Sequence, residues 1–338
     1  MQEPQEDEAR FRTQFYWWYP YFVRVTMKSV VLDLPESFVD YLLEDGVVLP
    51  SRCSAALGDD QLSDDESAGI GGCVDVDGDG SVPLPASREF PELDAQIERA
   101  IADLGGEVFP KLNWSCPLDS SWMNGGTLKC LRLSDVYVLL KSSERLVFDV
   151  EHMLAGSGRV KNRPERPVLV LRKWANLQPS MEFRMFVYKG ELVGICQRDC
   201  TAYFSCLQDE AFMDRIGNLL GVFFVQELKD RTMNQVLLPS YAADVYVDRL
   251  DRVWLVDINV LGQPTDPLLF AWTEITVLPI DGGRADSCCE IRVVDHPSSV
   301  LPSERTASQG PIDVTLAPDF PRFLQEVARQ RADTDTPP

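Results

Sequence analysis

The spacing of hydrophobic residues along the chain changes near residue 167. Before it, apolar residues recur at helical spacing, such as Phe38 with Leu42 and Ile97 with Ile101. After it, short apolar runs alternate with polar residues and are interrupted by turn residues, which is typical of strands. The sequence therefore predicts an α+β protein of two lobes, with a mostly antiparallel sheet in the second half.

The predicted elements of the first part are a strand at residues 25–35, helices at 35–46, 90–106 and 133–143, and a short strand that leads into a loop within 107–119. The predicted elements of the second part are strands at 167–174, 182–199, 244–249 and 252–259, and helices at 207–224 and 316–330. Ser134 is the predicted cap of the helix at 133–143. The predicted units are an N-terminal lobe of residues 1–167, a C-terminal lobe of 168–328 and a polar tail of 329–338.

Two stretches interrupt the hydrophobic pattern. Residues 58–88 are rich in Gly, Ser, Asp and Pro and predict a disordered acidic insert, and residues 281–311 predict a flexible loop. The insert contains "DVDGDG", which is similar to the start of a calcium-binding loop. Such a loop would need Glu at its twelfth position, and Ala86 stands there when Asp75 is counted as the first. We therefore expect no calcium site.

The segment "FYWWYPYF" at residues 15–22 is densely aromatic. Aromatic side chains of this kind either pack into a core or anchor a partner protein. We favour the core, and partner binding is the alternative.

The composition is that of an ordinary globular protein, with 45% hydrophobic and 25% charged residues among 338. No apolar run approaches the roughly 18 residues that cross a membrane. The first residues are acidic and lack the basic and apolar regions of a signal peptide. We therefore expect a cytoplasmic protein that does not bind membranes.

The net charge of −21 argues against direct binding to nucleic acid, because that binding depends on Lys and Arg at phosphates. The nine cysteines form no CxxC pair, and the only histidines are His152 and His296. Neither set has the spacing of a zinc site, and we expect reduced thiols and no histidine-based catalysis.

The stretch "DVYVDRLDRVWLVDINVLG" carries the strongest chemical signal. Residues two apart in a strand share a face, so Asp257 and Asn259 point to one side. If Arg249 to Arg252 form a four-residue turn, Asp244 lies opposite Asp257, with Cβ atoms about 5 Å apart. Three such oxygen ligands suit a hard cation, and Mg²⁺ fits best. The alternative is an exposed sheet face on which two acids happen to align.

A magnesium site of this kind would hold phosphate, so cations are expected elsewhere in strand-like contexts. The candidates are Lys111, Arg172, Lys173, Arg184 with Glu182, and Arg198 with Asp199. Each cation by itself could instead belong to a surface salt bridge. Taken together with the acidic hairpin, they favour a nucleotide, although no glycine-rich phosphate loop is present.

Several stretches resemble the cell-division-cycle-one-two-three family of eukaryotes. They are "WYPYFVRVTMKSVVLDLPESFVDYLLEDG", "FPKLNWSCPLD", "LVLRKW", "EFRMFVYKGELVGICQRD", "DVYVDRLDRVWLVDIN" and "GQPTDPLLFAWTEI", which together span residues 16–275. The resemblance implies an ATP-grasp-like fold with ATP held between two lobes. It also implies a monomeric assembly chaperone that binds the gamma subunit of translation initiation factor 2, promotes assembly of the heterotrimer and supports cell-cycle progression.

The resemblance also implies roles for single residues. ATP would be bound by Lys111, Trp114, Cys116, Leu171, Arg172, Lys173, Trp174, Glu182, Arg184 and Arg198, with Mg²⁺ held by Asp244, Asp257 and Asn259. Some positions depart from the family pattern. Cys116 replaces a residue that is usually smaller, Val260 and Leu261 replace aromatic or Pro residues, and Gln263 replaces Glu. None of these changes removes a proposed ligand.

Two functions remain open at this point. The first is the assembly chaperone, whose acidic surface would suit a partner with basic patches. The second is an ATP-dependent ligase or kinase that activates a carboxylate by phosphoryl transfer. No second group of residues for an acceptor substrate is evident in the sequence.

Overall fold

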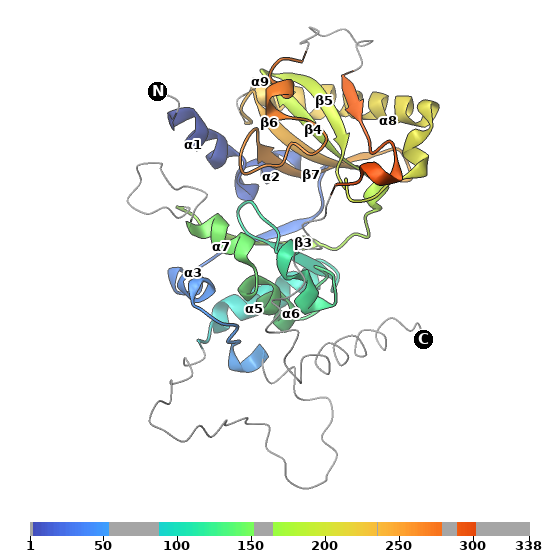
Figure 1. The fold of residues 1–338 in the computed structure, drawn as a ribbon. Helices are drawn as coiled ribbons and strands as arrows, with labels where there is room; N and C mark the ends of the chain where they lie inside the picture. The colour runs from blue at the N-terminus through green and yellow to red at the C-terminus, as the bar shows by residue number, and fades with distance from the viewer. Residues whose placement is uncertain (1–2, 54–87, 152–164, 235, 279–288, 302–338) are drawn as a thin grey trace, which may run out of the picture.

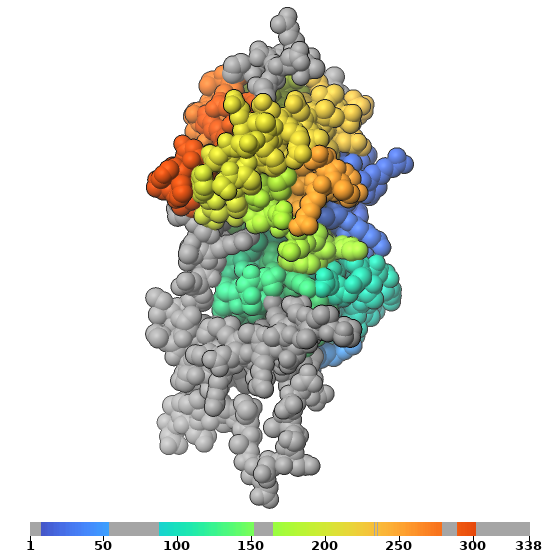
Figure 2. Space-filling view, turned by 90° about the vertical axis from the view of Figure 1, so that its right-hand side faces the viewer, coloured from blue at the N-terminus to red at the C-terminus, as the bar shows by residue number. Residues whose placement is uncertain are grey.

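The computed structural model describes residues 3–53, 88–151, 165–234, 236–278 and 289–301. The stretch that is similar to a calcium-binding loop and the predicted helix at 316–330 lie outside these residues. The described chain forms two stacked lobes (Figure 1). In the space-filling view the lobes are in contact, with the yellow surface of α8 above and the teal surface of the first lobe below (Figure 2).

The first lobe is built on a three-stranded antiparallel sheet. Its strands are β1 (Ser29–Asp33), β3 (Val168–Lys173) and β2 (Val108–Lys111), in that order across the sheet. Its helices are α3 (Glu36–Leu43), α5 (Pro91–Asp103), η1 (Leu118–Asn124), α6 (Leu133–Lys141) and α7 (Glu144–Glu151). The three predicted helices of this lobe are confirmed within a few residues at each end.

The start of α6 differs from the prediction. Asp135, not Ser134, satisfies the free backbone donors there, because its carboxylate accepts from the backbone N of Leu131 at 2.9 Å and of Arg132 at 3.2 Å. The hydroxyl of Ser134 is buried without a hydrogen-bond partner. An acid in the first turn can cap a helix in this way, and it also suits the positive end of the helix dipole.

Strand β3 contributes to two hydrophobic cores because its side chains alternate. Leu169 and Leu171 pack with the helices of the first lobe, and Val168 and Val170 pack with the core of the second lobe. The strand is therefore buried on both faces, which explains its unbroken apolar run. It follows the predicted boundary at residue 167 in the sequence, yet it is the central strand of the first lobe's sheet.

The second lobe contains a five-stranded sheet in the order β7–β6–β4–β5–β8. The strands are β4 (Glu182–Tyr188), β5 (Glu191–Gln197), β6 (Tyr241–Val247), β7 (Val253–Val260) and β8 (Glu290–Arg292). Neighbours are antiparallel except β5 and β8. The two-lobed α+β class with a mostly antiparallel second sheet is therefore confirmed.

Strand β8 corrects the prediction of a loop at 281–311. Three residues of that range pair in parallel with β5, with Ile291 opposite Ile195. A strand this short has too few residues for a visible period in the sequence, and only pairing with the preformed sheet stabilises it.

Helices cover one face of the second sheet. They are α8 (Glu210–Phe223), the π-helical η4 (Phe224–Lys229), α9 (Asp230–Met233) and the N-terminal α2 (Phe15–Phe22), which follows α1 (Glu3–Arg12). Phe15, Trp18 and Phe22 are fully buried in this core. The core interpretation of the aromatic segment is thus confirmed for these three side chains, whereas Tyr21 is half exposed.

The remaining short elements are η2 (Pro179–Met181), η3 (Ser205–Gln208), α10 (Trp272–Ile275) and η5 (Pro297–Ser299). The opposite face of the second sheet carries a smaller core around Phe186, Phe270 and Ile275. Among the described helices, none is both long and apolar enough to cross a membrane.

Candidate functional site

The two carboxylates of the predicted hairpin lie opposite each other. Asp244 of β6 pairs with Asp257 of β7. The turn is longer than predicted, because Asp248 N donates to Arg252 O at 2.9 Å and five residues separate Val247 from Val253. An irregularity after Asp244 shifts the register by one residue and compensates for the longer turn. The predicted pairing of Asp244 with Asp257 is therefore confirmed. The longer turn and the register shift were not predicted.

Asp244 is held by two arginines. Arg184 lies directly across from it on β4 and donates two hydrogen bonds, Nε to Oδ1 at 2.7 Å and Nη2 to Oδ2 at 2.8 Å. Arg198 Nε adds a bond of 3.3 Å to Oδ2. Burial by itself would raise the pKa of Asp244, but the charges and hydrogen bonds of Arg184 and Arg198 lower it to about 2. Asp244 is therefore ionised at neutral pH.

Asp257 is paired with a lysine of the other lobe. Lys111, the last residue of β2, places its Nζ 2.7 and 2.8 Å from the two carboxylate oxygens. The lysine side chain is 1% exposed and the aspartate side chain 17%. The neighbouring Asn259 donates to Asp244 Oδ2 at 3.3 Å, as expected for a residue on the same face. One ion pair therefore joins the two lobes at this edge of the hairpin.

Arg172 is the third cation buried at the lobe junction. Its Nη1 donates to Val256 O at 2.7 Å and its Nη2 to Thr26 Oγ1 at 3.1 Å, while its Nε has no partner. No carboxylate among the described residues lies within ion-pairing distance of it. Burial lowers the pKa of Arg172. The ordinary pKa of arginine is so high that the side chain still keeps its positive charge. The guanidinium thus remains a buried charge whose hydrogen bonds go to neutral groups, while the charge of Asp257 acts on it from further away.

The cations of the site outnumber the carboxylates that form direct ion pairs with them. Lys111, Arg184 and Arg198 form ion pairs with two carboxylates, Asp244 and Asp257, and Arg172 forms none among the described residues. The charges of Asp149 and Asp266 act on Lys111 and Arg184 without an ion pair. The carboxylate pair does not need a metal ion to relieve its repulsion, because Lys111 of β2, Arg184 of β4 and Arg198, which follows β5, already do so. The sequence predicted these cations as phosphate ligands, but not that they pair with the two carboxylates, because they come from distant parts of the chain. A buried cation that forms no ion pair, as Arg172 does, is costly without an anion, so the arrangement suits an anionic ligand.

The other predicted residues differ in how close they lie to these charges. Cys116 lies near enough to Lys111 and Asp257 for their charges to act on it, and burial raises the pKa of its thiol. Trp114 instead turns to α1, where its Nε1 donates to Arg10 O at 2.9 Å.

On β3 and β4 the placement follows strand alternation. The Leu171 side chain points into the first lobe's core, so only its backbone is able to line the site. Lys173 is exposed, and Trp174 packs edge-on against Phe109. Glu182 lies on the same face of β4 as Arg184, one strand period away.

Asp149 of α7 is a residue of the site that the sequence did not indicate. Its carboxylate accepts hydrogen bonds from Trp114 N at 3.1 Å, Ser115 N at 2.6 Å and Ser115 Oγ at 2.6 Å. Burial raises its pKa to about 6, although these hydrogen bonds and Lys111 oppose the change. Asp149 therefore fixes the loop between Lys111 and Cys116. Its helix is brought to that loop only by folding, and no local motif indicates this contact.

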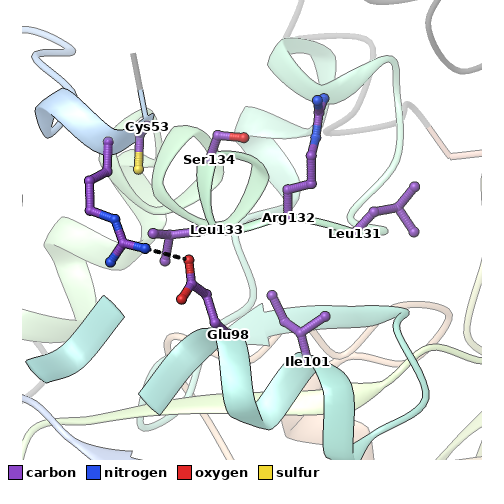
Figure 3. A pocket seen from close by; sticks show the side chains of 8 residues that line it. Cys53, Glu98, Ile101, Leu131, Arg132, Leu133 and Ser134 are labelled. Atoms are coloured by element: carbon purple, nitrogen blue, oxygen red, sulfur yellow. Dashed lines mark hydrogen bonds and ion pairs between the residues drawn. The ribbon is translucent and has the colours of Figure 1, made fainter. Parts of the chain in front are cut away.

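A cavity of about 440 Å³ lies elsewhere, in the first lobe between α5 and the start of α6 (Figure 3). Arg52 and Glu98 form an ion pair of 3.1 Å at its edge. Burial raises the pKa of the Cys53 thiol in its wall to about 12, so this thiol is protonated and a poor nucleophile. The cavity shares no residue with the charged site.

The hairpin carries the metal ligands that the sequence predicts. The described residues contain no group of three or more His, Cys, Asp or Glu side chains that could hold a metal ion. The hairpin itself offers two carboxylates, Asp244 and Asp257, and the amide oxygen of Asn259.

The fold and the site define a two-lobed α+β protein with a cation-rich, carboxylate-containing site at the lobe junction. The family model described as D123 matches residues 18–317, and the chain belongs to this family. A relative from Xenopus laevis, named "Translation initiation factor eIF2 assembly protein", is 33% identical over 97% of this chain and 98% of its own length. "Cell division cycle protein 123" from Phaeosphaeria nodorum is 36% identical over 83% of this chain and 72% of the relative.

A solved structure has the same fold. C-terminally truncated Cdc123 from Schizosaccharomyces pombe aligns with a TM-score of 0.64 and 30% identity, over 85% of this chain and 97% of that one. A RimK domain ATP-grasp protein from Sphaerobacter thermophilus aligns with a TM-score of 0.26, a similarity too low to transfer any property.

Proposed function

We propose that the site between the lobes binds ATP with Mg²⁺, in an ATP-grasp-like arrangement. The observation that carries this proposal is Arg172, a buried cation at the lobe junction that forms no ion pair among the described residues and has an unpartnered Nε. A polyphosphate supplies the missing negative charge in a geometry that arginine forks recognise. The unpartnered Arg172 Nε is a donor that such a ligand can satisfy.

The residues present fit a magnesium ion. Asp244, Asp257 and Asn259 would hold it, and the ion would neutralise phosphate charge and fix the orientation of the polyphosphate. Asp257 is bound to Lys111 in this structure, so metal binding requires the lysine to exchange its carboxylate for a phosphate oxygen. Without ATP, the ion and Lys111 therefore compete for the carboxylate of Asp257. With ATP, both can bind, because Lys111 then bonds a phosphate oxygen.

We further propose that the chain is an assembly chaperone for translation initiation factor 2, which binds the gamma subunit in the cytoplasm as a monomer. Support comes from membership of the family and from relatives whose names describe assembly of this factor. The net charge of −21 favours encounter with a basic partner surface and disfavours direct contact with nucleic acid.

The proposal is tested with the purified full chain, ATP and Mg²⁺. We expect calorimetry to show ATP binding, with little ADP or AMP formed over hours, and capture of the purified gamma subunit. Absence of ATP binding contradicts the nucleotide proposal. Turnover stimulated by a small carboxylate or amine contradicts the pure chaperone and supports the ligase.

Asp257→Asn tests the metal assignment separately. Without Mg²⁺, the variant is expected to bind ATP at least as tightly as the wild type, because no carboxylate competes for Lys111. With Mg²⁺, we expect the affinity gain of the wild type to be lost, because a charged ligand of the ion is missing. The measurement is the ratio of ATP dissociation constants with and without Mg²⁺, and an unchanged ratio shows that Asp257 does not bind the metal.

A further inference from the structure

One aromatic ring of the N-terminal segment lies against two cations of the site. The centroid of the Phe15 ring is 5.2 Å from Lys111 Nζ and 5.0 Å from Arg172 Cζ. Both distances are within the range of cation–π attraction. Phe15 is fully buried, so the contacts are desolvated, which strengthens them. The ring therefore does more than fill the core.

Helix α2, which carries Phe15, is bonded to both lobes. Phe15 N donates to Asn113 O at 2.8 Å, and Asn113 Nδ2 donates to Gln14 Oε1 at 2.7 Å. On the other side, Trp17 Nε1 donates to Val236 O at 2.9 Å. Phe15 is thus fixed to the loop that directly follows Lys111 while its helix packs on the second lobe.

The groups that stabilise the buried charge of Arg172 determine how strongly that charge can still attract a ligand. A carboxylate partner would neutralise the guanidinium. Arg172 has no carboxylate at ion-pairing distance among the described residues, although the charge of Asp257 acts on it from further away. Two rings lie near it, Phe15 at 5.0 Å and its cross-strand neighbour Phe109 at 5.4 Å. An aromatic face stabilises a buried cation without cancelling its charge. The rings thus hold Arg172 in place and leave its positive charge available to an anion.

We propose that Phe15 is a positioning residue of the anion site, which holds Lys111 and Arg172 in the arrangement that meets the polyphosphate. Phe15 does not touch the ligand and acts through the two cations. The segment at residues 15–22 is thereby part of the nucleotide site as well as of the core. This inference rests on the proposed ATP binding.

The test compares Phe15→Leu with Phe22→Leu in the full chain. Phe22 is a matched control, because it lies in the same helix and core, is equally buried, and its ring contacts Arg231 outside the site. We expect both variants to lose similar thermal stability. Phe15→Leu should raise the dissociation constant of Mg²⁺–ATP about tenfold, whereas Phe22→Leu should change it less than twofold.

A chain that lacks Arg172 shows whether Phe15 acts by positioning this cation or only by packing the core. In an Arg172→Met chain, Phe15→Leu should weaken ATP binding by only about threefold further, since one of its two cations is gone. Phe109→Leu, a milder change at a partly exposed residue, should weaken binding by about threefold on its own.

Three outcomes overturn the role of Phe15. They are an equal affinity loss in Phe15→Leu and Phe22→Leu, an undiminished effect of Phe15→Leu in the Arg172→Met chain, and unchanged affinity in Phe109→Leu. Absence of ATP binding by the unchanged chain is a different result, because it overturns the proposed function together with this role.

Discussion

Replacing Asp244 by alanine is expected to lower the free energy of unfolding by about 3–5 kcal/mol. The side chains of Arg184 and Asp244 are 4% and 10% exposed, and they share two hydrogen bonds. Without the carboxylate, the guanidinium stays buried with Asp266 O as its remaining partner, at 2.7 Å. An uncompensated buried charge is the reason for so large an effect. Urea unfolding followed by circular dichroism measures it.

Asp33→Ala is the matched control. Asp33 pairs with Arg166 at 2.5 Å, but the two side chains are 66% and 51% exposed, so its loss should cost less than about 1 kcal/mol. Replacing Arg184 by Met and Asp244 by Leu together should restore much of the stability, because no charge is left unpaired. Equal losses in Asp244→Ala and Asp33→Ala would contradict a desolvated ion pair.

The same ion pair predicts a pH dependence. The pKa of Asp244 is lowered from its ordinary value to about 2, chiefly because two arginines outweigh the effect of burial. A depressed carboxyl pKa contributes stability above the unfolded pKa of about 3.9 and loses it as the pH falls towards 2. The stability difference between wild type and Asp244→Ala should therefore be constant above pH 5 and shrink below pH 4.

Lys111→Met is expected to raise the dissociation constant of Mg²⁺–ATP by about 100-fold. A charge-assisted hydrogen bond contributes about 1.5–3 kcal/mol, and the lost charge also weakens binding at longer range. The lysine side chain is 1% exposed, so no neighbouring solvent can replace it. Calorimetric titration of wild type and variant gives the comparison.

Lys229→Met is the control for Lys111→Met. Lys229 also bonds both oxygens of a carboxylate, Glu191, at 2.9 Å, but this pair lies between η4 and β5, and its side chains are 30% and 28% exposed. ATP affinity should stay within twofold. If Lys111→Met also stays within twofold, Lys111 does not contact the nucleotide and the phosphate position must be reassigned.

Local periodicity was sufficient for strands β1 to β7 and for helices α3, α5, α6 and α8, whereas α1, α2 and α7 were not predicted. The helix over Pro91–Asp103 follows from apolar residues at helical spacing, and the strands of the hairpin follow from alternation. Two elements whose residues show no hydrophobic periodicity were also missed. Strand β8 exists only because β5 offers it an edge, and the π-helical turn at Phe224–Lys229 extends α8 without any sequence signal.

The sequence by itself determined the acidic face of the hairpin, because side chains two apart in a strand must share a face. Asp244, Asp257 and Asn259 were placed together correctly on that basis. Only the tertiary structure decided which charges meet them. Lys111, Arg172 and Arg184 come from three strands far apart in the chain, and Phe15 reaches two of these cations from the N-terminal helix. Spacing specifies neighbours within one element, whereas the balance of charge at a site depends on how distant elements pack.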